Sequence, residues 1–159
     1  MSSILTDTLG GDTNAFASGD ATAMVRELAD REELRELTAR YAFLISQKLS
    51  AADLFTEDGG FLFRKPDGET QEARGRDALE VIFAEILEPP NHNLPTVHNH
   101  IFSIDGDTAT GICWIELHAA KDGKDWIGSG YYEDQFRREK GRWKFVLRDS
   151  TLVKWELAH

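Results

Sequence analysis

Residues 96–117, with the sequence TVHNHIFSIDGDTATGICWIEL, contain two runs of β-branched and aromatic residues joined through Asp105-Gly106. An Asp-Gly pair between such runs predicts a tight β-hairpin, because the turn needs positive φ at its centre. Pairing Ile104 with Asp107 sets a register in which three large side chains face small ones: Phe102 opposite Ala109, His100 opposite Gly111, and His98 opposite Cys113. Both histidines would then lie on the face of Phe102, which predicts a concave surface with room beside it.

Composition limits the class of protein and its partners. A chain of 159 residues is one domain by size and can bury a substantial core. Its formal net charge of −10 argues against nucleic acid and anionic membranes as partners and suits a soluble protein that binds neutral or cationic small molecules. No apolar run is long enough to span a bilayer, and no secretory signal is evident at the N-terminus.

The single cysteine, Cys113, falls in a predicted strand, so no disulfide can form within the chain. A buried and inert thiol suits it better than a nucleophile. This cysteine usage indicates a reducing compartment, and we predict a cytoplasmic protein.

The N-terminal third is predicted to be an arm followed by a helix. Residues 1–19 are mostly small and polar, which predicts a mobile arm, or one that orders only against a neighbour, ahead of a single domain over residues 20–159. Asp20 can start a helical stretch, and Asp30 followed by Glu33 forms a capping-box pattern. Apolar residues then recur at helical spacing to about residue 47: Leu34, Leu37, Tyr41, Leu44 and Ile45.

The rest of the chain is predicted to be mainly strands. The elements expected are a short helix over 51–55, strands at 61–63 and 71–73, a helix over 75–87 stopped by Pro89-Pro90, a loop over 91–95, the hairpin, and strands over 126–138 and 142–149. Helices followed by a long antiparallel meander predict an α+β fold with a strongly curved antiparallel sheet.

Two further residues are candidates for a site. Tyr41 lies on the apolar stripe of the first helix, where it is either a core tyrosine or a hydrogen-bond donor lining a cavity. Asp134 alternates with Tyr132 and Phe136 on a core-facing strand, where a carboxylate is costly unless it is paired. It is therefore either part of a site or a structural carboxylate bonded to a backbone amide or to Arg148.

Several short motifs resemble the SnoaL-like family of the nuclear-transport-factor-2-like superfamily. They are Arg40-Tyr41-Ala42, Leu54-Phe55-Thr56-Glu57-Asp58, Gly75-Arg76-Asp77-Ala78-Leu79, His98-Asn99, Ile104-Asp105-Gly106-Asp107-Thr108-Ala109, Tyr132-Glu133-Asp134-Gln135-Phe136 and Gly141-Arg142-Trp143-Lys144-Phe145. The resemblance implies a cone-shaped sheet closed by N-terminal helices. Relatives include scytalone dehydratase, ketosteroid isomerase and polyketide cyclases, which move or remove a proton on a small, largely apolar substrate and need no cofactor.

The same resemblance implies a mechanism and an assembly. Several relatives use an aspartate–histidine pair whose aspartate lies late in the first helix, but residues 46–50 of this chain contain no carboxylate. Relatives form dimers or trimers through the sheet. Ile112, Trp114 and Glu116 alternate away from the predicted cavity, so a homodimer or homotrimer is expected here.

The leading hypothesis is a lyase or isomerase that uses general acid–base catalysis on an apolar, aromatic or polycyclic substrate. His98 or His100 would be the base, Tyr41 would donate a hydrogen bond, and Asp134 would orient the histidine. The predicted substrate pocket has four further residues: Phe102, Cys113, Trp126 and Tyr132.

Three alternatives remain open at this point. Either histidine could have a structural role. The chain could be a non-catalytic protein that binds a small apolar molecule, as the missing carboxylate suggests. Two imidazoles in a His-x-His pattern could also hold a metal ion, although the pattern of cupin-type sites needs a glutamate that the hairpin turn displaces.

Overall fold

The computed structural model describes residues 3–10 and 19–158 and has the α+β architecture that the sequence predicts. In chain order its elements are α1 (Ser3–Gly10), α2 (Ala21–Ser46), the 3-10 helix η2 (Ala52–Leu54), β1 (Phe55–Arg64), β2 (Thr70–Arg74), α3 (Arg76–Leu87), β3 (His92–Asp105), β4 (Thr108–Lys121), β5 (Lys124–Glu139) and β6 (Arg142–Leu157). The strands form one six-stranded sheet in the order β2-β1-β6-β5-β4-β3.

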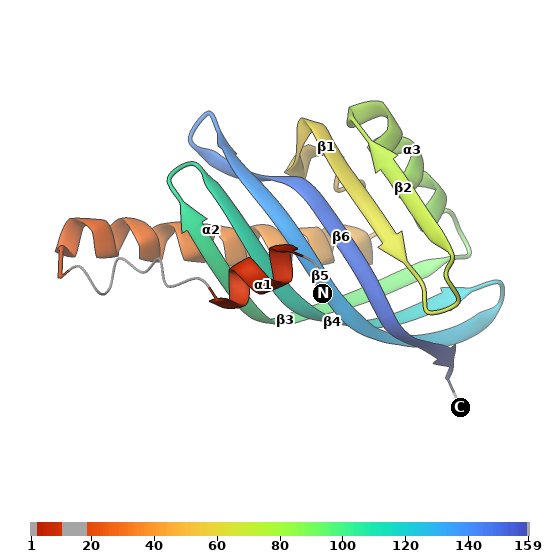
Figure 1. Ribbon diagram of the computed structural model, residues 1–159. Coiled ribbons are helices and arrows are strands. Elements are labelled where there is room, and N and C mark those ends of the chain that lie inside the picture. The colour runs from red at the N-terminus through yellow and green to blue at the C-terminus, as the bar shows by residue number, and fades with distance from the viewer. Residues whose placement is uncertain (1–2, 11–18, 159) are drawn as a thin grey trace.

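The sheet is curled and mainly antiparallel, as the sequence predicts, with one parallel pair. Four neighbouring pairs are antiparallel, but β1 runs parallel to β6, with Phe61 beside Arg148. In Figure 1, α2 lies behind the sheet and α1 in front of it, while α3 lies beside β1 and β2. The side chains between α2, α3 and the inner face of the sheet form the core. No helix in the described part of the chain is long and apolar enough to cross a membrane.

Helix α2 begins ten residues before the predicted capping box. Asp20 is its N-cap and accepts hydrogen bonds from the backbone N–H groups of Thr22 and Ala23 at 2.9 and 3.3 Å. Asp30 is instead buried inside the helix, where its Oδ1 accepts from Trp143 Nε1 at 3.1 Å and from an arginine of β5. Asp30, which the sequence suggested as a helix cap, therefore links α2 to the β5–β6 hairpin.

The segment predicted as a mobile arm contains a helix. Helix α1 packs on the outer face of this chain's own sheet, where the hydroxyl of Thr8 lies 2.7 Å from that of Thr110. The described part of the predicted arm, Ser3–Gly10, is thus a helix that lies against the sheet of its own chain. The rest of that prediction, at residues 1–2 and 11–18, lies outside the described residues.

The predicted hairpin forms, but its register is wrong by two residues. Ile104 pairs with Ala109 and Asp105 with Thr108, so the two-residue loop is Gly106-Asp107, with φ of +59° at its glycine. Positive φ at the first loop residue is the feature that requires glycine in a type II′ turn. Phe102 consequently faces Gly111, where a Cβ would lie only 2.8 Å from the Phe102 ring.

A bulge in β3 separates the two histidines. Asn99 has φ of +57°, and the pairing shifts between His98, opposite Trp114, and Ile101, opposite Ile112. The extra residue in the bulged strand turns His98 to the outer face, while His100 lies on the inner face. The prediction that both histidines share a face is therefore wrong.

Strand β3 also starts earlier than expected, at His92, so residues 91–95 are not a loop. Pro95 pairs with Leu117 inside this strand. Because β3 is an edge strand, a proline that lacks an N–H can lie there without costing a hydrogen bond of the sheet.

Candidate active site

A cavity of about 180 Å³ opens between α2, α3 and the inner face of the sheet. The residues lining it are Tyr41, Ile45, Phe61, Phe63, Lys65, Gln71, Glu85, Ile86, Asn91, Asn93, Pro95, Ile115, Leu117, Ala120, Lys121, Tyr132 and Trp155. A dry cavity of about 150 Å³ in another protein holds one benzene molecule. The hollow in this chain therefore has room for one substituted ring, which fits the aromatic alternative of the predicted substrate better than the polycyclic one.

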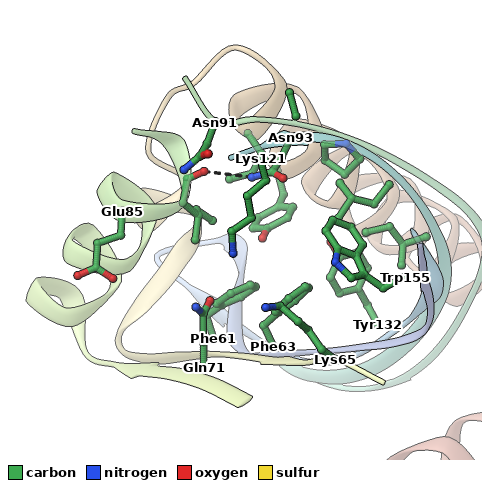
Figure 2. Close-up of a pocket in the computed structure, with 17 residues that line it drawn as sticks. Phe61, Phe63, Lys65, Gln71, Glu85, Asn91, Asn93, Lys121, Tyr132 and Trp155 are labelled. Atoms are coloured by element: carbon green, nitrogen blue, oxygen red, sulfur yellow. Dashed lines mark hydrogen bonds between the residues drawn. The ribbon is translucent and has the colours of Figure 1, made fainter. Parts of the chain in front are cut away.

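Aromatic side chains form the walls of the cavity. In Figure 2, Phe61 and Phe63 lie on one side of the hollow, and Tyr132 and Trp155 on another. Trp155 lies over Gly128, where a Cβ would come within 2.8 Å of the indole. Trp126, which was predicted to line the pocket, stacks on Trp155 at 5.3 Å between ring centroids and supports that wall from outside the lining.

Two tyrosines are the buried polar groups of the lining. Tyr41 comes from α2 and Tyr132 from β5, each side chain is only 3% exposed, and their ring centroids are 6.1 Å apart. Burial raises the pKa of Tyr41 and of Tyr132 well above the usual value for a phenol. Both hydroxyls therefore keep their protons at neutral pH. The two side chains hydrogen-bond to each other, which uses one of these protons, and the other can be donated to an oxygen of a bound molecule.

A buried ion pair lies beside these tyrosines. The guanidinium carbon of Arg148 is 3.7 Å from the centroid of the Tyr132 ring and 4.3 Å from that of Tyr41. Asp134 binds Arg148 through two contacts of 3.1 Å, from Nε to Oδ1 and from Nη2 to Oδ2. Asp134 thus makes the bond to Arg148 that its structural alternative predicted, and it forms no hydrogen bond with a histidine within residues 3–10 and 19–158.

The charge of this pair follows from its surroundings. Burial raises the pKa of Asp134 to about 6, and the neighbouring Arg148 acts in the opposite direction. The carboxylate is therefore mostly ionised at pH 7 and balances the Arg148 cation. Nη1 of Arg148 has no hydrogen-bond partner among the described residues.

His100 is bonded to α2 and lies outside the cavity lining. Its Nε2 is 2.8 Å from Thr38 Oγ1, and that hydroxyl donates its only proton to the carbonyl oxygen of Arg35 at 2.8 Å. Nε2 must then carry the imidazole proton. Burial, followed by the positive charges of Arg148 and Arg35, lowers the pKa of His100 to about 4, so the ring is neutral at pH 7.

Of the eight site residues predicted from sequence, Tyr41 and Tyr132 line the cavity and the other six do not. Phe102 packs against Phe136 and stacks on His100 at 5.9 Å between ring centroids. Cys113 is buried, and its burial raises the pKa of the thiol to about 12, as suits an inert cysteine.

His98 and His100 cannot share a metal ion, because they lie on opposite faces of β3. Within residues 3–10 and 19–158, no group of three histidine, cysteine, aspartate or glutamate side chains is placed to hold a metal ion.

Polar side chains that the sequence did not single out complete the lining. Lys121 ends β4, Lys65 follows β1, and Asn93 in β3 donates its Nδ2 proton to the Ile86 carbonyl oxygen at 3.1 Å. Lys121 precedes Asp122-Gly123, which in the sequence indicated only a turn. The alternation of Phe61 and Phe63 in a short strand was the available signal for the aromatic wall.

A family model for the SnoaL-like domain matches residues 26–149, which is most of the chain. The chain belongs to the SnoaL-like family. The matched region includes most of α2, the whole of α3 and both cavity tyrosines. No curated protein matches the chain significantly.

Solved structures with the same fold include proteins with and without an assigned activity. A nuclear-transport-factor-2-like protein with a cystatin-like fold from Novosphingobium aromaticivorans is 26% identical, with a TM-score of 0.62 over 86% of this chain and 92% of its own. A protein of unknown function from Mycobacterium tuberculosis is 25% identical, with a TM-score of 0.69 over 82% and 76%. A proposed scytalone dehydratase from N. aromaticivorans, 20% identical with a TM-score of 0.73 over 84% and 90%, is similar in fold alone.

Proposed function

We propose that this SnoaL-like protein binds a small, largely apolar molecule of about one ring in its cavity and recognises an oxygen atom of that molecule. The observation that carries the proposal is the pair of buried tyrosines, Tyr41 and Tyr132, in an otherwise aromatic and aliphatic hollow. Pockets that are mostly apolar, with a few convergent polar groups, are typical of small-molecule sites. The hydrogen bond between the two tyrosines uses one of their two hydroxyl protons, and the other proton favours a ligand oxygen over a purely hydrocarbon ligand.

A lyase or isomerase activity is the second candidate, and the same two tyrosines favour it. Protonated phenols beside a buried cation can stabilise the negative charge that develops on a carbonyl or leaving oxygen while a proton moves on the neighbouring carbon. Among the described residues, the lining contains no imidazole and one acidic residue, Glu85, whose carboxylate points away from the hollow in Figure 2. The cavity therefore has clear hydrogen-bond donors for a ligand oxygen and a less clear candidate for a base that would remove a proton from carbon. For this reason ligand binding is the first candidate function.

A ring ketone and a matched hydrocarbon test the proposal. Cyclohexanone and methylcyclohexane are titrated into the wild type and into the Tyr41→Phe and Tyr132→Phe variants, and binding is followed by ligand-observed NMR. We expect each variant to weaken cyclohexanone binding by about five- to tenfold, the effect of one hydrogen bond, and to leave the hydrocarbon unchanged. Equal losses for both ligands, or no binding of either one, would refute the recognition of an oxygen.

Hydrogen–deuterium exchange in heavy water distinguishes the two candidate functions, ligand binding and lyase or isomerase activity. If the protein is a lyase or isomerase of this type, it exchanges the hydrogens next to the carbonyl of cyclohexanone for deuterium faster than buffer does, and the Tyr→Phe variants lose that exchange. Binding of cyclohexanone without this hydrogen exchange supports the first candidate, a protein that binds the ligand without a reaction.

A further inference from the structure

The polar part of the cavity lining is positively charged although the chain as a whole is acidic. In the part of the chain that the structure describes, the lining has two cations, Lys65 and Lys121, and one acidic residue, Glu85, in a protein with a formal net charge of −10. Figure 2 shows Lys121 reaching into the hollow and Lys65 on the side of Phe61 and Phe63, whereas the Glu85 carboxylate is turned away. A ligand inside the hollow would therefore meet two ammonium groups and no facing carboxylate.

The two lysines differ in their partners. Lys65 forms an ion pair with Glu69, so much of its charge is already balanced. Lys121 has no ion-pair partner within residues 3–10 and 19–158, although its hairpin contains Asp122 and Asp125. The Asp122-Gly123 loop has positive φ at both residues, +52° and +70°, which is the pattern of a type I′ turn. This tight turn fixes the end of β4, from which the Lys121 side chain enters the cavity.

We infer that the bound molecule carries an anionic group, such as a carboxylate, that pairs with Lys121. Its ring would lie between Phe61, Phe63 and Trp155. This inference rests on the proposed function and narrows it to one-ring organic acids. The net negative charge of the chain does not oppose it, because charges farther away than about 8–10 Å are screened at physiological salt, whereas the Lys121 ammonium would be in direct contact.

Benzoate and benzamide are the probes, because they have nearly the same shape and differ in charge. Their affinities are measured by calorimetry at pH 7 for the wild type, for Lys121→Met and for Lys124→Met. Lys124 is the matched control: it pairs with Lys121 across the hairpin and is exposed, but it does not line the cavity. Circular dichroism checks that each variant is folded.

We expect the wild type to bind benzoate about tenfold more tightly than benzamide, as one charge-assisted hydrogen bond provides. Lys121→Met removes that preference, and Lys124→Met changes it by less than about twofold. Raising the salt concentration should weaken binding of benzoate by the wild type and leave benzamide unaffected, a readout that needs no variant.

The outcomes distinguish this inference from the proposed function. If benzamide binds as well as benzoate, the cavity binds rings, but the inference that the ligand carries an anionic group is wrong. If Lys121→Met keeps the full preference for benzoate, the assignment to Lys121 is wrong. If neither probe binds, both the inference and the proposed function are wrong.

Discussion

The guanidinium of Arg148 lies face-on against the Tyr132 ring, with its central carbon 3.7 Å from the ring centroid. The same guanidinium is held from the side by both carboxylate oxygens of Asp134. Arg148 is fully buried and Asp134 is 1% exposed, so neither charge reaches water. The tyrosines of the cavity therefore rest on a buried ion pair, and the shape of the cavity depends on that pair staying intact.

Breaking the ion pair from one side should destabilise the protein strongly. Asp134→Asn leaves the Arg148 cation buried without a counter-charge, and we expect the free energy of unfolding to fall by about 3–5 kcal/mol. Urea denaturation measures this loss. Arg137, a surface residue whose side chain is 39% exposed and which pairs with Asp58 and Glu139, is the control, and Arg137→Met should cost about 1 kcal/mol or less. Similar losses in the two variants would contradict the role given to Asp134.

His100 should titrate well below a normal histidine. Its pKa is lowered to about 4, so we expect its ring C–H resonances in NMR spectra to shift only below pH 5, with His100→Gln identifying the signal. Because the folded-state pKa lies below the unfolded value of 6.5, the neutral ring contributes stability that is fully present above about pH 6.5 and is lost as pH falls through 4. In the His100→Gln variant, the free energy of unfolding should depend less on pH between about 6.5 and 4. A midpoint at or above pH 6.5 would contradict the burial described for this residue.

Gly130 is a position where a side chain cannot fit. A Cβ there would lie 2.0 Å from the carbonyl oxygen of Thr151 and 2.8 Å from the Cα of Leu152, both backbone atoms of the paired strand. We expect Gly130→Ala to destabilise the protein by about 3 kcal/mol or more, measured by urea denaturation. Gly10→Ala, which has no atom within 4 Å of the new Cβ, should stay within about 0.5 kcal/mol of the wild type. A Gly130→Ala variant as stable as the wild type would show that β5 and β6 pair differently.

The outer face of the sheet is the surface on which we expect self-association. Trp114 and Ile101 are 37% and 45% exposed there, and Trp114 stacks on Tyr131. Light scattering at micromolar concentration should give a dimer or trimer, and Trp114→Glu should shift it toward monomer. A wild-type monomer would refute this expectation.

Sequence patterns predicted the elements well, because apolar periodicity and turn residues are local signals. They failed at the register of the β3–β4 hairpin, where the loop is Gly106-Asp107 and not Asp105-Gly106. The bulge at Asn99 adds a residue to one strand, and no local pattern distinguishes it from regular alternation. Because of that single residue, His98 and His100 lie on opposite faces of β3, so they do not act as the pair that the sequence suggested.

The candidate site was only partly predictable for a similar reason. Tyr41 and Tyr132 lie on apolar stripes of a helix and a strand, so their inward direction followed from periodicity. Lys121 and Trp155 reach the cavity only because the sheet curls and brings the ends of β4 and β6 over it. Curvature of this kind is a property of the whole sheet, so it cannot be predicted from the few residues around Lys121 or Trp155.

Filling the cavity tests whether a ring binds between α2, α3 and the sheet. Ile86→Trp places an indole in the lining, whereas Val81→Trp makes the same change on the exposed side of α3. Calorimetry with cyclohexanone should then give wild-type affinity for the Val81→Trp protein and no detectable binding for a folded Ile86→Trp protein. Equal binding by the two variants would contradict the account.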